Sequence, residues 1–437
     1  MNIAVLGGGF SGLSAAYYLL KNGHTVTLFE KEPVLGGLAS GFRGNGWDWD
    51  LERVYHHIFS NDDAILEFAH DTGFDEVFFS SPKTASLYET EKHNLITYPL
   101  DSPSDLLRFP RLSSVEKIRA GAILAILKYG PHISQYDVWQ AQSFLRQAMG
   151  PHAADELFGE IFRKKFGNYA GKIVAAFMWA RIKKRTKQLG YMEGGFQSFI
   201  SHIEEKINSM GGIIYTNTAV SRVEKRNNTF TILLSGEISH TKIFDAVIAT
   251  LPTPIISHVC APLLSSETRS RWKNITYLHA VNLVIEAEKP LLDAIYWLNI
   301  CVPKMPMMVA VQHTNFISQS HYNGHTILYI GNYVDNNNPL LSMDADGVLN
   351  FFAPYLKRIN SGYTKTIIQK YLFKASYAQP IFDGDFIYHK PGMRTETPGF
   401  YIANLDMTYP YDRGTNYAVA LGKQVANSIG LVKQHNA

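Results

Sequence analysis

A short segment rich in acidic, aromatic and histidine side chains, DWDLERVYHHIFSND at residues 48–62, could exchange protons with a bound molecule. It holds two adjacent histidines, His56 and His57, with four carboxylates and one arginine. Histidine changes its charge near neutral pH and serves as a general acid or base. Adjacent side chains on a strand point to opposite faces, so we expect only one of the two to meet a reacting group. The alternative is that both histidines pack or cap the loop.

A glycine-rich turn near the first residue has the spacing of a dinucleotide-binding loop. Gly7, Gly9 and Gly12 follow the apolar run 3–6 and precede a predicted helix over 13–20. The first glycine permits a tight turn, the second lets the backbone approach a pyrophosphate, and the third lets helix and strand pack closely. The N–H groups at the helix start would face the phosphates.

The residues after this turn favour FAD over NAD. A second predicted strand, 25–29, ends at Glu30, where an acidic side chain accepts hydrogen bonds from ribose hydroxyls. The pair Gly36-Gly37 then stands where an NAD-dependent dehydrogenase usually enters its next helix. Small residues let the backbone lie close to the pyrophosphate and ribityl chain of a longer cofactor. The alternative for this pair is an ordinary surface turn.

Composition limits the class of protein. The chain has 437 residues, 46% hydrophobic and 18% charged, as in an ordinary soluble protein of two sizeable domains. Its net charge of +3 does not indicate nucleic acid as a partner. The two cysteines, Cys260 and Cys301, form no metal motif, and no other His or Cys stands at ligand spacing beside the two histidines, so we expect no metal. No signal peptide precedes the first strand and the apolar run 120–127 is too short to span a bilayer, so we expect a cytoplasmic protein.

Residues 1–60 resemble the amino-terminal part of the FAD-dependent amine oxidase superfamily, which includes protoporphyrinogen oxidases and phytoene desaturases. The stretches 189–224, 244–252 and 397–429 extend the resemblance over most of the chain. We therefore expect an α/β fold with a discontinuous, Rossmann-like FAD-binding domain and an α+β substrate domain. The expected FAD-binding segments are 1–85, 190–255 and 395–437, and the expected substrate-domain segments are 86–189, mainly helical, and 256–394, mainly strands.

The resemblance also implies which residues hold FAD. Val220 would touch the adenine side, and the closing motif YPYDRGTNY at 409–417 would bring backbone donors to the flavin. We expect Asp412 and Arg413 to pair, and the absence of cysteine near this motif favours a dissociable, non-covalent cofactor. The expected FAD-binding residues are Gly7, Gly9, Phe10, Ser11, Gly12, Glu30, Lys31, Gly36, Gly37, Leu38, Ala39, Val220, Asn404, Asp412, Arg413, Thr415, Asn416 and Tyr417.

The resemblance implies an FAD-dependent oxidoreductase, amine oxidase-like, that dehydrogenates a C–N or C–C bond of a small organic substrate by hydride transfer to the flavin. We expect the catalytic residues to be His56, His57 and Tyr409, although tyrosines of the closing motif could equally be core residues. No second G-x-G-x-x-G occurs, so O₂ or a quinone is the expected electron acceptor. No lysine can be assigned as catalytic, so the resemblance does not single out amines.

Two alternatives keep the flavin. The segment His57-Ile58-Phe59 resembles one in UDP-galactopyranose mutases, which favours a redox-neutral, flavin-dependent isomerase acting on a nucleotide sugar. The closing motif does not look like that family's. A non-catalytic FAD-binding protein is the other alternative.

A basic run, RIKKRTK at 181–187, is the main charge feature. We expect a solvated helix face, the alternatives being attraction to a phosphate-bearing substrate or to an anionic membrane surface. The apolar stretch 118–129 is expected to be a buried helix of the substrate domain, although peripheral membrane contact is an alternative.

Overall fold

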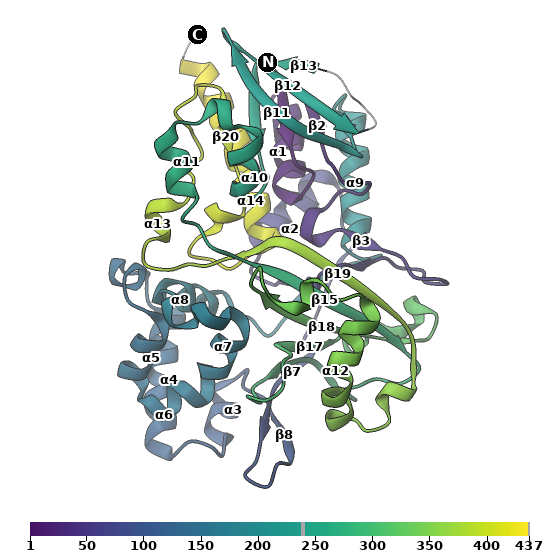
Figure 1. Ribbon diagram of the computed structural model, residues 1–437, viewed down its shortest axis with the longest axis vertical. Coiled ribbons are helices and arrows are strands. Elements are labelled where there is room, and N and C mark those ends of the chain that lie inside the picture. The colour runs from purple at the N-terminus through teal and green to yellow at the C-terminus, as the bar shows by residue number, and fades with distance from the viewer. Residues whose placement is uncertain (237–240, 436–437) are drawn as a thin grey trace.

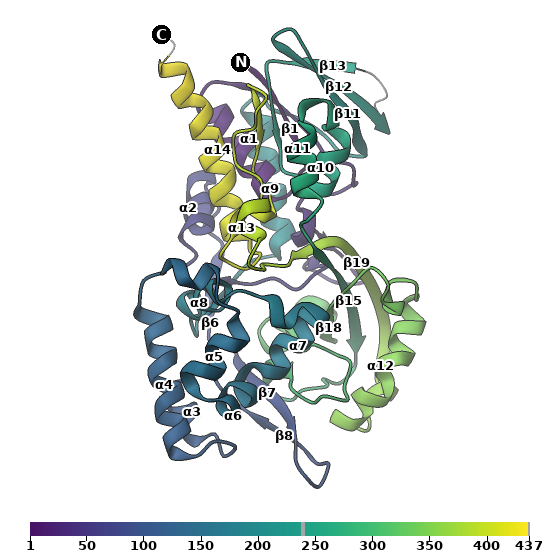
Figure 2. The ribbon, with the colours of Figure 1, turned by 60° about the vertical axis from the view of Figure 1, so that its left-hand side comes forward.

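The computed structural model describes residues 1–236 and 241–435, which form two halves stacked along the long axis of the molecule (Figure 1). Residues 237–240 and 436–437, which belong to two of the expected FAD-binding segments, lie outside the described residues. The upper half contains a parallel sheet, and the lower half contains a larger sheet beside a layer of helices (Figure 2).

Five short parallel strands form the upper sheet in the order β10-β2-β1-β14-β20. They are β1 (Asn2–Leu6), β2 (Thr25–Phe29), β10 (Ile213–Tyr215), β14 (Ala246–Ala249) and β20 (Phe400–Ile402). Such short strands, apolar along nearly their whole length, are typical of a parallel sheet covered on both faces. Because the strands come from three separate parts of the chain, the predicted discontinuous Rossmann-like fold is confirmed.

Alternation along β1 shows how the two faces of this sheet are covered. Ile3 and Val5 pack among the helices, whereas Ala4 and Leu6 pack toward a three-stranded antiparallel sheet. The helices are α1 (Phe10–Lys21), α2 (Asp63–Thr72), α9 (Phe196–Ser209) and α14 (Thr415–His435). The antiparallel strands are β11 (Thr218–Arg226), β12 (Thr229–Gly236) and β13 (Thr241–Phe244).

The last helix closes the fold by packing on the first. The Ser14 hydroxyl donates to the Val419 carbonyl at 2.9 Å. A Cβ at Gly422 would lie 2.3 Å from the Ser11 carbonyl oxygen, so the two helices approach too closely there for a side chain. This contact fixes the start of α14 beside the glycine-rich turn.

The lower sheet has seven strands in the order β19-β15-β18-β17-β16-β7-β8. They are β7 (Lys83–Glu89), β8 (Leu95–Tyr98), β15 (Tyr277–Ala287), β16 (Ile295–Ile300), β17 (Val309–Gln312), β18 (Thr326–Val334) and β19 (Ile367–Pro380). Helix α12 (Ala345–Ile359) packs Val348, Phe352 and Leu356 on one face. The opposite face contributes side chains such as Val309 and Tyr329 to the core shared with the upper half.

The helical layer follows β8 along the chain. Its helices are α3 (Pro103–Arg108), α4 (Ser114–Tyr129), α5 (Ala141–Met149), α6 (Pro151–Ala154), α7 (Glu160–Phe166) and α8 (Ala175–Lys184). The expectation that 118–129 is buried is wrong, because Ile118 and Tyr129 of α4 are 70% and 80% exposed. Within the described residues, no helix combines the length and apolarity needed to cross a membrane.

Two expected domain boundaries differ from the arrangement of the elements. Strand β7 pairs within the lower sheet although its first residues fall in the expected segment 1–85. Conversely, α10 (Thr253–Val259), α11 (Ser266–Trp272) and α13 (Phe386–His389) lie with the upper half (Figure 1). The chain therefore crosses between the halves near β15 and after β19.

Two small sheets position the histidine segment. Strands β3 (Gly41–Phe42) and β4 (Leu51–Glu52) pair with each other. Strand β9 (Leu189–Met192) pairs with β5 (Ile58–Phe59) and with β6 (Val77–Ser80). Phe59 lies opposite Leu189, so the two histidines and the end of the basic run reach the same place.

Candidate active site

The glycine-rich turn has the shape that a pyrophosphate requires. Gly7 has φ +105°, and a Cβ there would lie 2.7 Å from the Thr250 hydroxyl oxygen. A Cβ at Gly12 would lie 1.9 Å from the Gly7 carbonyl oxygen. Because the first N–H groups of a helix have no partner within it, those at the start of α1 are available to an anion.

The end of β2 and the second glycine pair lie against this turn. The buried Glu30 carboxylate accepts hydrogen bonds from the N–H groups of Gly8 at 2.7 Å and Glu32 at 2.9 Å. The Gly36 N–H donates to the Gly8 carbonyl at 2.8 Å. A Cβ at Gly37 would lie 3.3 Å from the Gly9 Cα. Both glycine segments thus present bare backbone at one place, as an extended dinucleotide needs.

Several other expected cofactor residues have side chains engaged within the protein or exposed at its surface. The Phe10 ring packs against Phe196 and Phe199, and the Ser11 hydroxyl donates to a carbonyl at 2.6 Å. Lys31 is exposed and pairs with Glu32 at 3.2 Å. The remaining members, Leu38, Ala39 and Val220, lie buried or half-buried in the short 3-10 helix Gly37–Ala39 and on β11.

Asn404 offers an unused acceptor for the cofactor. Its amide nitrogen donates to the Leu251 carbonyl at 3.0 Å and to the Thr253 hydroxyl at 2.9 Å. Its Oδ1 atom is buried and has no partner among the described residues. An unpaired buried acceptor is costly, and a ribityl hydroxyl would satisfy it. The cradle of residues therefore fits FAD.

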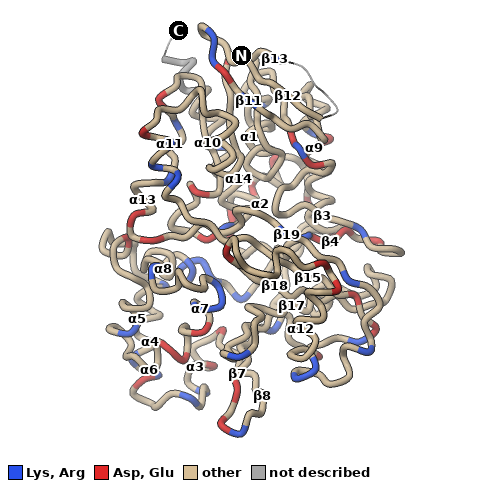
Figure 3. The backbone as a smooth tube through the Cα atoms, viewed as in Figure 1, with Lys and Arg blue, Asp and Glu red and all other residues tan. Residues whose placement is uncertain are grey.

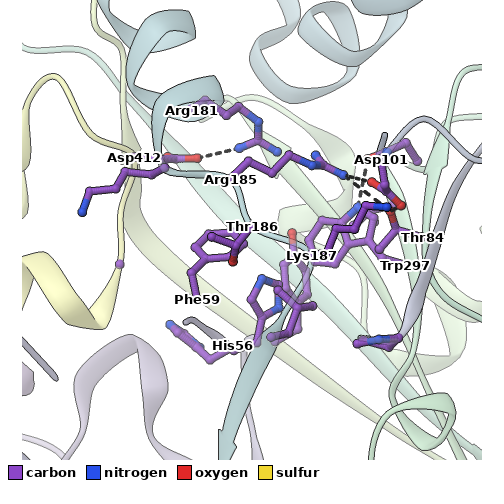
Figure 4. A pocket seen from close by; sticks show the side chains of 18 of the residues that line it. His56, Phe59, Thr84, Asp101, Arg181, Arg185, Thr186, Lys187, Trp297 and Asp412 are labelled. Atoms are coloured by element: carbon purple, nitrogen blue, oxygen red, sulfur yellow. Dashed lines mark hydrogen bonds and ion pairs between the residues drawn. The ribbon is translucent and has the colours of Figure 1, made fainter. Parts of the chain in front are cut away.

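A cavity of about 610 Å³ lies beside the start of α14, between the two halves (Figure 4). The histidine segment, α7, α8 and the closing motif form part of its wall, and β7, β16, β17 and β18 form another part. Both His56 and His57 line it. Strand β5 begins only at Ile58, so the histidines lie in irregular backbone and the strand alternation on which the prediction of opposite faces rests does not apply to them.

His56 has a fixed tautomer. Its Nδ1 lies 2.6 Å from the Val54 carbonyl oxygen, and a carbonyl only accepts, so Nδ1 carries the hydrogen and Nε2 is an acceptor. Burial, with a smaller contribution from Arg413, lowers the pKa of His56 to about 3. His56 is therefore a neutral acceptor at neutral pH and not a proton donor.

His57 is also neutral, and its surroundings are cationic. Its Nδ1 lies 3.1 Å from the Tyr296 hydroxyl. Burial lowers the pKa of His57 to about 4, and the charges of Arg185, Arg181 and Arg413 act in the same direction. Three guanidinium groups from two separate segments are thus close enough to influence one imidazole.

The closing motif differs from the expected Asp412–Arg413 pair. The Asp412 carboxylate accepts hydrogen bonds from Lys165 and from Arg181, the latter at 3.1 Å. The Arg413 guanidinium instead donates to the Tyr333 hydroxyl and lies 5.5 Å from the centre of that ring. Between these two neighbours the described residues show a hydrogen bond from the Arg413 backbone N–H to the Asp412 carboxylate at 3.0 Å and no side-chain ion pair, so the expected side-chain pairing is wrong.

The start of α14 combines a structural contact with a free helix end. The Asn416 side chain accepts a hydrogen bond from the Ile65 N–H at 3.1 Å and so holds the start of α2. The rings of Tyr411 and Tyr417 stack with centroids 4.7 Å apart, and both line the cavity together with Gly414 and Thr415.

Tyr409 does not line this cavity. Its ring lies 5.2 Å from Phe382 and 5.6 Å from Phe386, and its hydroxyl donates to the Asp137 carboxylate. The structure therefore gives no support to the expected catalytic role and shows a half-buried aromatic residue packed against the core instead.

Two features of the site were not identified from the sequence. The buried Glu52 carboxylate behind the histidine segment accepts from the Tyr191 hydroxyl at 2.8 Å and the Phe196 N–H at 2.9 Å, and burial raises its pKa to about 7. Trp297 and Tyr333 line the cavity from β16 and β18. The only signal in the sequence for Trp297 and Tyr333 is the alternation of side chains along their strands. The residues that face them across the cavity are far away in the chain, so no local motif marks this part of the site.

Comparisons with known proteins agree with this geometry. The profile of the family described as flavin containing amine oxidoreductase matches residues 10–429. A 15-cis-phytoene desaturase of Glycine max is 22% identical over 318 residues, which cover 68% of this chain and 54% of that protein. The chain spans about half the length of the curated relatives it matches.

Solved structures share the fold over nearly the whole chain. A cyclohexylamine oxidase from Brevibacterium oxydans superimposes with a TM-score of 0.75 at 12% identity, covering 99% of each chain. An oxidoreductase from Methanosarcina mazei superimposes with a TM-score of 0.73 at 18% identity, covering 98% of this chain and 100% of the other.

Proposed function

This chain belongs to the flavin-containing amine oxidoreductase family, and on that premise we propose that it dehydrogenates a C–N or C–C bond of a small organic substrate. The family supports FAD as the cofactor and flavin-dependent oxidation as the reaction class. The observation that supports dehydrogenation of such a bond is that the start of α14 and two neutral histidines line the same cavity.

Bound FAD supplies the acceptor for a hydride, that is, for two electrons and one proton from a substrate C–H bond. The second hydrogen leaves the substrate as a proton, which needs a base or solvent. The unprotonated Nε2 of His56, held in one tautomer by the Val54 carbonyl, accepts a hydrogen bond there, and because burial lowers the pKa of His56 to about 3 the proton itself passes on to solvent. Neighbouring aromatic side chains, including Tyr55 and Trp297, give the cavity an apolar surface that orients the substrate and limits water.

The names of the relatives are consistent with oxidation of either kind of bond. One similar protein is named a phytoene desaturase, which acts on C–C bonds, and one similar structure is a cyclohexylamine oxidase, which acts on a C–N bond. Neither name suggests a redox-neutral isomerase, so the comparisons do not favour that alternative. For the return of electrons we propose O₂ or a quinone, since the sequence has no second G-x-G-x-x-G motif.

Anaerobic reduction of the bound flavin tests this proposal. The purified holoenzyme would be mixed with amines, polyprenoids and porphyrinogens in separate experiments, with dithionite as the chemical control. We expect one class to bleach the flavin and air or a quinone to restore its colour. If dithionite bleaches the flavin and no substrate class does, the proposed dehydrogenation is wrong.

A further inference from the structure

The cavity has a strongly basic wall, defined here as Lys83 of β7, Arg181 and Lys184 of α8, and Arg185 and Lys187 just after α8. Figure 4 shows Arg181 directed toward Asp412 and Arg185 directed toward Asp101. Four of the five basic residues of 181–187 line this cavity, and Arg185 and Lys187 are exposed and lie beyond the end of α8, so the expectation of a solvated helix face does not describe the whole run. The fifth, Lys183, points away and donates to carbonyls at the end of α4.

Acidic side chains neutralise only part of this wall. Of the residues that line the cavity, seven are Lys or Arg and four are Asp. Asp412 pairs with Arg181 as well as Lys165, and Asp101 pairs with Arg185. Asp105 is engaged at the start of α3, where it accepts from the Ser102 hydroxyl at 2.6 Å. The fourth, Asp62, accepts from the Phe59 N–H at 2.8 Å.

Three lysines remain without an acidic partner. Within the part of the chain that the structure describes, no carboxylate lies in ion-pair distance of Lys83, Lys184 or Lys187. The Lys184 ammonium has only a long contact of 3.4 Å to the Asn61 carbonyl. Cations gathered around a concave, partly apolar site repel one another and raise the local concentration of anions.

Another part of the cavity surface is apolar and aromatic. Trp297 packs edge-on against Tyr55 with ring centroids 5.1 Å apart, and Leu189, Ile295 and Val309 lie on the same surface. A ligand made only of charged groups would leave this apolar surface without apolar contacts. The cavity therefore suits a molecule with an apolar part and a compact, multiply charged anionic group.

We propose that the basic wall binds a phosphate or diphosphate group of the substrate. This inference rests on the proposed function for the reaction and adds the substrate class. Lysines supply mobile point charges and arginines supply fixed pairs of donors, a combination that matches the several oxygens of a phosphate group. The group can be carried by a nucleotide or by an isoprenoid alcohol, and both carriers have an apolar or planar part for the aromatic surface.

The test is binding of inorganic pyrophosphate to the FAD-loaded protein, measured by calorimetry without turnover. We expect one site per chain. The double variant Lys184→Gln/Lys187→Gln should weaken binding about tenfold or more, since it removes two charge-assisted contacts. The matched control is Lys183→Gln, which lies in the same run but outside the cavity and should bind as the wild type does.

Competition experiments identify the carrier. Displacement of pyrophosphate by uridine diphosphate supports a nucleotide-borne group, and displacement by geranyl diphosphate supports an isoprenoid-borne group. The proposal is overturned if pyrophosphate does not bind, if the control variant loses as much affinity as the double variant, or if a dicarboxylate such as succinate binds more tightly. A yellow protein that fails to bind pyrophosphate contradicts this inference alone, whereas a protein without flavin contradicts the proposed function.

Discussion

The Lys165 ammonium of α7 donates to the Asp412 carboxylate, which stands just before α14. The two side chains are 11% and 22% exposed, and Arg181 joins them from α8. Burial lowers the pKa of Lys165 to about 8, while Lys165 and Arg181 outweigh burial and hold the pKa of Asp412 below its usual value. This contact links the helical layer to the loop that leads into the proposed cofactor-binding end of α14.

Replacing Asp412 by Asn should destabilise the protein, because it leaves Lys165 buried without an opposite charge. Breaking a buried pair on one side costs about 3 kcal/mol. We expect a lower midpoint in urea unfolding and faster loss of FAD. The control is Asp155→Asn, which breaks the exposed pair with Arg146 and should change stability by less than about 1 kcal/mol. Equal effects of the two substitutions would contradict the structural role of Asp412.

Replacing Gly12 by Ala should weaken FAD binding by about tenfold or more, since the new methyl group would collide with the Gly7 carbonyl and displace the turn. Gly171→Ala is the matched control, because a Cβ there meets nothing within 4 Å. The measurement is the FAD dissociation constant from flavin fluorescence. Unchanged affinity in the Gly12 variant would show that the turn does not hold the cofactor.

Glu52 should make stability depend on pH. Its pKa is about 7 in the folded protein and 4.5 for an ordinary glutamate, so its contribution to stability is fully present below about pH 4.5 and is lost as pH rises through 7. In Glu52→Gln this loss is absent. The free energy of unfolding of the variant, relative to that of the wild type, should therefore rise by up to about 3 kcal/mol between pH 5 and 8. Denaturant unfolding at the two pH values measures this gain, with Glu67→Gln, at an exposed site, as the control. If the difference in unfolding free energy between wild type and variant does not change with pH, the raised pKa of buried Glu52 is refuted.

His57 should stay neutral from about pH 5 upward, because burial and three arginines hold its pKa at about 4. NMR of histidine-labelled protein, with the His57 signal assigned from His57→Asn, follows its titration. We expect no midpoint between pH 5 and 8. A midpoint near 6.5 would mean that the imidazole is exposed to water and can act as a proton donor.

Much of the cofactor half could be predicted from sequence because its signals are local. The glycine turn, the helix after it and the strand ending at Glu30 occupy the first 30 residues, and each has a steric or hydrogen-bonding reason that acts within a few residues. The closing motif, also a local signal, leads into α14 (Thr415–His435).

The cavity could not be predicted in the same way, because contacts between distant segments form it. The basic run has the periodicity of an exposed helix face, and only the pairing of Phe59 with Leu189 brings it beside the histidines. Asp412 was expected to pair with its chain neighbour, yet its partner Lys165 is 247 residues away. Tyr409 has the same residue type as the cavity-lining Tyr411, and only the packing against Phe382 separates their roles.

The most direct test of the central claim is the visible spectrum of the purified protein, followed by acid release and identification of the chromophore. The account predicts a yellow protein that releases FAD, close to one molecule per chain, without covalent attachment. A colourless protein that cannot be reconstituted with FAD, or one that releases NAD instead, would contradict it.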